Sequence, residues 1–308
     1  MRILVSGAHG YIGSKLVARL RDAGHAVGVI VRREPTFESE WTRCLDTLLW
    51  DMTCPHAGQP PEGYDLLIHA AGANDIDSAD SREALLGTAL SARHAADFCR
   101  KAQITRVIYF STFQVYGRSD GDVSEDAPAH CLNDYALTHW FAEEYLRMAE
   151  RNGQLDCVVV RPTNVYGTPL NRDIDRWTLV PGCFCKAAVA SQSIVLRSSG
   201  HQYRNFIHLD AVADAVDFLA RNFDHAKGRT CILAGDEVLT IRSVVEDVIA
   251  AYKRKLAAPC RLVIESTLPA HATPLHISAT NLPELGYRAP PVATVGEEIE
   301  RTIDLLGR

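Results

Sequence analysis

The stretch Gly7-Ala8-His9-Gly10-Tyr11-Ile12-Gly13 lies between the apolar run Ile3-Leu4-Val5 and an amphipathic run over residues 15–20. Three glycines at this spacing let the backbone turn tightly, approach a phosphate and pack a helix closely on a strand. The N-terminus of that helix presents unpaired N–H groups and partial positive charge. The stretch therefore predicts a dinucleotide site whose contacts come from Gly7, Gly10, Tyr11, Ile12 and Gly13.

Short apolar runs alternate with longer helical patterns on the C-terminal side of this turn. Strands are expected at residues 3–6, 26–31, 47–50, 66–69, 106–111 and 157–161, and helices at 13–23, 81–102 and 135–152. This alternation is typical of βαβ units and a parallel sheet. Beyond residue 162 it weakens, with short elements at 193–197 and 260–265 and helical patterns at 210–221, 242–255 and 294–306.

The pattern predicts an α/β protein with a Rossmann-type doubly wound parallel sheet and a smaller C-terminal substrate lobe. Residues 1–162 are expected to form the dinucleotide-binding domain. Residues 163–308 are expected to form mainly the substrate lobe, with some segments returning to the Rossmann core.

Composition excludes several classes of function. The 308 residues carry a net charge of −6 that is spread along the chain, which argues against binding to nucleic acid or anionic lipid. The nine cysteines do not form a zinc-binding pattern, so we expect no metal and a reducing compartment. No secretory signal precedes the first strand and no apolar run approaches ~18 residues, so we expect a cytoplasmic protein without a membrane span.

The residues that follow the second, third and fourth strands predict the rest of the cofactor site. Arg32 and Arg33 follow Val29-Ile30-Val31, where an NAD site usually has an acidic residue, so NADP(H) is favoured and NAD(H) is possible. The alternative is that both arginines end a strand without contacting the cofactor, since Glu34 could pair with one. Further cofactor contacts are expected from Asp51, whose carboxylate can accept from the adenine amino group, from Met52, and from the small residues Ala70, Ala71 and Gly72.

Beyond the glycine turn, four further motifs carry a resemblance to a known family. They are Ser111-Thr112-Phe113-Gln114-Val115-Tyr116-Gly117 followed by Tyr135, then Arg161-Pro162-Thr163-Asn164-Val165-Tyr166-Gly167, then Arg204-Asn205-Phe206-Ile207-His208, and Leu285-Gly286-Tyr287. The chain resembles the extended short-chain dehydrogenase/reductase family, and within it the nucleotide-sugar epimerases, reductases and dehydratases. The resemblance implies hydride transfer at a sugar carbon. It also implies a homodimer formed by the helices at 81–102 and 135–152.

The resemblance assigns Tyr135 as the acid/base and Thr112 as the hydroxyl partner, with Ser111 beside it and Pro162 against the cofactor. Family members place a lysine four residues after the tyrosine, where it holds the nicotinamide ribose and supplies positive charge. Here that position is His139, on the same helix face. Three explanations are open: His139 replaces the lysine as ribose ligand and proton relay, the cofactor's charge and another group activate Tyr135, or the chain binds cofactor without turnover.

The resemblance also assigns substrate contacts. Asn164 is expected to contact the sugar or the diphosphate; the alternative is that its amide only stabilises a turn. Arg204 is expected to bind the diphosphate; the alternative is that it is a solvated surface charge. Family dehydratases follow the threonine with an Asp-Glu pair, whereas this chain has Phe113-Gln114, which disfavours dehydration. Leu86 stands where an asparagine is frequent.

Three functions follow from this sequence. The favoured one is NADPH-dependent reduction of a 4-keto nucleotide sugar, because two arginines indicate an exchangeable NADPH. The second is a nucleotide-sugar 4-epimerase with bound NAD(P). The third is a non-catalytic protein that binds NADP(H) or a nucleotide sugar, because His139 replaces the lysine.

Overall fold

A computed structural model describes residues 1–33, 45–170, 174, 177–265 and 273–307. Glu34, the alternative partner for the two arginines, lies outside the described residues. The central element is a seven-stranded sheet in the order β11-β7-β5-β4-β1-β2-β3, with every neighbouring pair parallel. Its strands are β1 Arg2–Ser6, β2 Ala26–Val31, β3 Asp46–Leu49, β4 Leu66–His69, β5 Arg106–Phe110, β7 Asp156–Pro162 and β11 Thr230–Leu233. The predicted Rossmann-type parallel sheet is confirmed.

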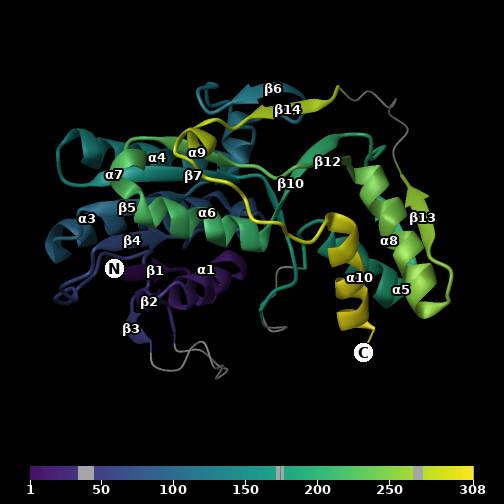
Figure 1. Cartoon of the computed structure of the whole chain (residues 1–308), viewed down its shortest axis with the longest axis horizontal. Helices are drawn as coiled ribbons and strands as arrows, with labels where there is room; N and C mark the ends of the chain where they lie inside the picture. Colours follow the sequence, from purple (N-terminus) through teal and green to yellow (C-terminus); the bar gives the residue numbers. More distant parts are fainter. Residues whose placement is uncertain (34–44, 171–173, 175–176, 266–272, 308) are drawn as a thin grey trace.

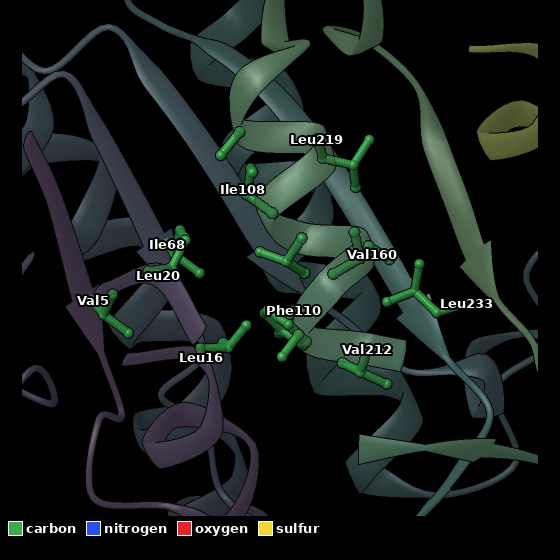
Figure 2. Close-up of a cluster of buried hydrophobic side chains, with 14 of the residues drawn as sticks. Val5, Leu16, Leu20, Ile68, Ile108, Phe110, Val160, Val212, Leu219 and Leu233 are labelled. Carbon is green, nitrogen blue, oxygen red and sulfur yellow. The ribbon is translucent and has the colours of Figure 1, made fainter. Parts of the chain in front are cut away.

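Helices cover both faces of this sheet because successive strand residues point to opposite sides. On one face, α1 (Tyr11–Asp22) and α6 (Leu209–Arg221) pack on a core that Figure 2 shows in close-up. On the other face, α3 (Ser91–Ala102) and α4 (Asp134–Arg151) pack on the alternate strand residues, Tyr109 among them. The side chain of Tyr109 therefore points toward α4.

The predicted helix over residues 81–102 is interrupted in the structure. It consists of α2 (Ser81–Ala84), a π-helical segment η2 (Leu85–Leu90) and α3. Within η2, the Thr88 hydroxyl oxygen accepts a hydrogen bond from the backbone N–H of Ala73 at 3.0 Å. The π segment thus anchors the loop that follows β4, which lines the cavity described below.

The remaining elements form a second group, with α5, α8, α10 and β13 on one side of the molecule in Figure 1. Helices α5 (Gly182–Ser191), α8 (Ile241–Leu256) and α10 (Val295–Leu306) share their own hydrophobic core. In the small sheets, β10 pairs with both β12 and β8, β13 pairs with β9, and β14 pairs with β6. Their strands are β6 Gly121–Ser124, β8 Asn164–Tyr166, β9 Ser193–Leu196, β10 Tyr203–His208, β12 Glu237–Thr240, β13 Arg261–Ile264 and β14 Leu275–Ser278. Short helices are η1 Asp77–Ala79, η3 Phe113–Tyr116, α7 Phe223–Ala226 and α9 Asn281–Glu284.

Two segments from beyond residue 162 complete the central layers. Strand β11 pairs in parallel with β7, and α6 packs beside α1 through the core of Figure 2. Polar contacts reinforce this packing: Asp217 of α6 lies 2.8 Å from His25 Nε2 and 3.2 Å from the Arg19 guanidinium. The central core is therefore not formed by the first half of the chain alone.

Candidate active site

A cavity of about 730 Å³ lies at the carboxyl ends of the parallel strands. Its walls come from the glycine turn, the end of β2, the loop after β4, the end of β5, the start of α4, and β7, β8 and β10. The predicted site residues that line it are Gly7, Gly10, Tyr11, Ile12, Gly13, Arg32, Arg33, Ala70, Ala71, Gly72, Ser111, Thr112, Tyr135, His139, Pro162, Asn164 and Arg204. The fold thus brings together residues that are far apart in the sequence.

The glycine turn has no space for side chains. A Cβ atom on Gly7, whose φ is +70°, would lie 2.7 Å from the carbonyl oxygen of Ala70, and one on Gly13 would overlap the carbonyl oxygen of Gly7. Helix α1 begins with Gly10 as N-cap, with no side-chain cap and no acidic residue in its first turn. Its first N–H groups therefore face the cavity without a competing carboxylate, as an anionic dinucleotide requires.

Two residues that were predicted to contact the cofactor, Asp51 and Met52, are not among the described residues that line this cavity. Asp51 accepts hydrogen bonds from the backbone N–H and the hydroxyl of Thr53, at 3.0 and 2.8 Å, and the Met52 carbonyl accepts one from His94. The Thr53 N–H lowers the pKa of Asp51, with Arg32 adding to the effect. Their contact with the cofactor stays a prediction.

A buried histidine holds the loop that follows β4. His69 Nδ1 lies 2.7 Å from the Ser6 hydroxyl, which also accepts the backbone N–H of Ala71 at 3.3 Å. His69 Nε2 lies 3.4 Å from the Ser91 hydroxyl. Burial lowers the pKa of His69 to about 4, so its ring is neutral at pH 7 and bonds as one donor and one acceptor.

The residues predicted to be catalytic meet where η3 and α4 begin. Thr112 is the N-cap of η3, and its hydroxyl oxygen accepts the backbone N–H of Gln114 at 3.2 Å. Asn133 caps α4 through Ala136, which places Tyr135 in the first turn and His139 one turn later. The rings of Tyr135 and His139 meet edge to face with centroids 4.7 Å apart. Capping by short polar side chains thus sets the position of this pair.

The imidazole of His139 is buried behind Tyr135. Its Nδ1 lies 2.8 Å from the hydroxyl of Tyr109 on β5. Burial lowers the pKa of His139 to about 3, with a smaller contribution from His69. His139 therefore carries no positive charge near neutral pH.

An ion pair beneath the cavity escaped the sequence analysis. Glu143 of α4 is fully buried and accepts hydrogen bonds from Arg161 Nε and Nη2 of β7, at 2.9 and 2.6 Å, and from Ser111 at 2.5 Å. The Arg161 guanidinium also lies over the rings of Tyr116 and Trp140. Ser111 is thus oriented by a buried carboxylate. The only sequence feature that could have indicated a role for Glu143 was its position among the inward-facing residues of α4.

Two substrate-side residues line the opposite part of the cavity. Asn164 Nδ2 donates to the carbonyl of Asn205 at 2.9 Å, and Arg204 Nη1 donates to the carbonyl of Tyr203 at 2.8 Å. Burial lowers the pKa of Arg204, and no carboxylate of the described residues forms a salt bridge with it. A half-buried guanidinium without a carboxylate partner is suited to an anionic ligand.

The match to a sequence family decides the assignment. The model of the NAD dependent epimerase/dehydratase family matches residues 3–234, which include the glycine turn and the Thr112, Tyr135 and Asn164 motifs. The chain belongs to this family. The family is one of enzymes, and the cavity of this member is lined by the glycine turn and by Tyr135 and His139.

Relatives of this family member include both reductases and epimerases. A dTDP-4-dehydro-6-deoxy-D-allose reductase of Streptomyces bikiniensis is 25% identical over 97% of this chain and 95% of its own length. A UDP-glucose 4-epimerase of Mycolicibacterium smegmatis is 29% identical over 70% of this chain and 72% of its own length. The resemblance to nucleotide-sugar enzymes is therefore confirmed, and reduction and epimerisation both occur among the relatives.

Solved structures of similar fold include complexes with NAD. The structure of MoeE5 with UDP-glucose and NAD has a TM-score of 0.80 at 22% identity, and covers 99% of this chain and 100% of its own. UDP-glucuronic acid 4-epimerase from Bacillus cereus, with UDP-glucuronic acid and NAD, has a TM-score of 0.80 at 19% identity over 99% of each chain. These likenesses confirm the fold.

Among the helices of the described residues, none has the length and apolar character needed to cross a membrane. Across the same parts of the chain, no three His, Cys, Asp or Glu side chains gather as a metal site would require.

Proposed function

We propose that this family member is an NADPH-dependent reductase of a 4-keto nucleotide sugar. Tyr135 donates the proton to the C4 oxygen, and the Thr112 hydroxyl binds the same oxygen. When bound, NADPH supplies the hydride that converts the C4 carbonyl into an alcohol. The observation that carries the choice of reduction is the burial of His139 against Tyr109, which keeps its imidazole neutral.

Reduction and oxidation need opposite protonation states of the tyrosine. A phenol has a pKa near ~10 in water and stays protonated at pH 7 unless a neighbouring cation lowers that value. His139 occupies the position one turn after Tyr135 and is neutral, because burial lowers its pKa to about 3. The protonated phenol is the form that donates a proton in a reduction. An epimerase must also remove the hydroxyl proton of the sugar in its first step, and a neutral His139 does not favour the ionised phenol that this step needs.

The charged residues along the cavity support NADPH as the cofactor and a nucleotide sugar with a diphosphate as the substrate. Arg32 and Arg33 line it at the end of β2, where Val31 replaces the acidic residue of an NAD site, and this favours the 2′-phosphate of NADPH. At the other side, Arg204 is half-buried without a carboxylate partner among the described residues, which favours a diphosphate. The reductase relative, which matches nearly the whole chain, agrees with this direction of reaction.

The test measures loss of nicotinamide absorbance when the protein and NADPH are mixed with a panel of 4-keto nucleotide sugars. One sugar is expected to oxidise NADPH, and Tyr135→Phe is expected to abolish turnover while NADPH still binds. Tyr145→Phe is the matched control, because Tyr145 lies on the same helix and does not line the cavity. Replacing Arg32 and Arg33 by serine is expected to shift preference toward NADH.

A second candidate, a 4-epimerase, is favoured by the relative from Mycolicibacterium smegmatis. Inversion at C4 of a UDP-hexose with catalytic NAD(P), and no net oxidation of NADPH with any keto sugar, would establish it. Cofactor binding without either reaction would establish a binding protein.

We further propose that the protein is a homodimer. Leu137, Phe141 and Met148 of α4 and Leu85 of η2 are each about 40% exposed, and the three α4 residues recur near helical spacing. Trp140, by contrast, lies over the Arg161 guanidinium and faces inward. Sedimentation equilibrium is expected to give twice the chain mass, and Phe141→Lys is expected to reduce it to the monomer.

A further inference from the structure

The hydroxyl of Tyr109 lies behind His139, on the side away from the cavity. Tyr109 is fully buried on β5, and its oxygen lies 2.8 Å from His139 Nδ1. We propose that Tyr109 is a positioning residue that fixes His139 as the Nε2–H tautomer, so that this neutral imidazole offers a hydrogen-bond donor to a hydroxyl of the bound dinucleotide. This inference rests on the proposed dinucleotide site.

The direction of the Tyr109–His139 hydrogen bond follows from a count of hydrogens. Burial holds both groups neutral, because it raises the pKa of Tyr109 well above its ordinary value and lowers that of His139 to about 3. Each group therefore has one N–H or O–H. No described residue other than His139 accepts a hydrogen bond from the Tyr109 hydroxyl. If Nδ1 carried the imidazole hydrogen, the buried phenol hydrogen would have no acceptor, an arrangement that proteins avoid.

The opposite edge of the imidazole faces the cavity. A Cβ atom placed on Gly72 would lie 3.6 Å from His139 Cε1 and 3.9 Å from Nε2, and both residues line the cavity. His139 Nε2 has no hydrogen-bond partner among the described residues. Nearby His69 does not compete for it, because Ser6 and Ser91 already occupy both of its ring nitrogens. The Nε2–H group is thus available to a ligand.

As the Nε2–H tautomer, His139 is a hydrogen-bond donor that carries no charge. Nε2–H donates to a hydroxyl oxygen, as an ammonium group would, but places no positive charge beside Tyr135. Tyr109→Phe removes the only donor to Nδ1 among the described residues, so the Nδ1–H tautomer becomes populated beside the Nε2–H tautomer. The Nδ1–H form turns Nε2 into an acceptor, so the dinucleotide loses one hydrogen-bond donor.

The first measurement uses the cofactor-free protein labelled with ¹⁵N in its histidines. Two-bond ¹H–¹⁵N correlations distinguish the tautomers, and the His139→Gln spectrum assigns the signal among the twelve histidines. The wild type is expected to show only the Nε2–H form near pH 7. Either the Nδ1–H form or a charged ring in the wild type would overturn the proposal, and this result needs no variant of Tyr109 to fold.

The second measurement is NADPH binding, followed by nicotinamide fluorescence. Tyr109→Phe is expected to populate the Nδ1–H tautomer and to weaken NADPH binding about tenfold. Tyr252→Phe is the control, because this buried tyrosine lies in the α5, α8 and α10 core. Unchanged affinity together with an unchanged tautomer would refute the role of Tyr109. Failure of the wild type to bind NADPH would refute the proposed function instead, whatever the tautomer.

Discussion

Removal of the charge of Glu143 tests how the base of the cavity is stabilised. Glu143→Gln keeps the size of the side chain and leaves the guanidinium of Arg161, a residue only 3% exposed, without a counter-charge. The substitution weakens two charged hydrogen bonds to Arg161, at 2.9 and 2.6 Å, and one from Ser111. Loss of one partner of a buried ion pair costs about 3–5 kcal/mol. We expect the free energy of unfolding to fall by that amount.

The assay is urea unfolding followed by circular dichroism, with Glu144→Gln as the matched control. Glu144 is the next residue of α4, but its side chain is 41% exposed and its ion pair with Arg151 spans 3.4 Å at the surface. Exposed pairs of this kind contribute about 0–1 kcal/mol. If Glu143→Gln destabilises the protein no more than Glu144→Gln does, the reasoning about the buried pair is wrong.

Three further predictions concern the turn, the histidines and the substrate. Gly13→Ala is expected to abolish NADPH binding, because the new Cβ overlaps backbone, whereas Gly10→Ala, with its Cβ 3.1 Å from the nearest atom, is expected to weaken binding only moderately. Lowering the pH from 7 to 5 is expected to reduce the free energy of unfolding by about 2 kcal/mol for each of His69 and His139. In the unfolded chain a histidine takes up a proton below pH ~6.5, whereas the buried rings of His69 and His139 have pKa values of about 4 and about 3. Stability is thus complete above pH 6.5 and falls with acidification; a pH dependence in urea titrations that His69→Asn leaves unaltered would contradict this assignment. Arg204→Met is expected to raise the KM for the nucleotide sugar at least about tenfold with no change in the Kd of NADPH, because one charge-assisted contact to the diphosphate is lost. Steady-state kinetics measures the KM and fluorescence titration the Kd. Equal effects on both ligands would exclude a specific role of Arg204 in binding the diphosphate.

Local sequence patterns were sufficient to predict the main strands and the residues that line the cavity. The Gly7 to Gly13 turn and the strand ends near Arg32, Ala70 and Thr112 were predicted, because a strand followed by a turn and a helix is specified by neighbouring residues. Parallel strands then carry their ends to one edge of the sheet. The order of these motifs was therefore enough to predict which residues meet.

Contacts between distant segments were not visible in the sequence. The pairing of β11 with β7 and the π-helical segment at Leu85–Leu90 depend on packing that no local period reports. The same holds for Asp51, which follows β3 as predicted but bonds to Thr53 and does not line the cavity.

The sequence by itself determined the family, the parallel sheet and the substitution of histidine for lysine at position 139. Only the tertiary structure decided what that histidine is: a neutral ring between Tyr109 of β5 and Gly72, with a pKa lowered to about 3 by burial. It also decided that Glu143 and Arg161 pair beneath Ser111. The physical reason is that protonation and hydrogen bonding depend on solvent exclusion and on partners from other strands and helices, which exist only after the layers have packed.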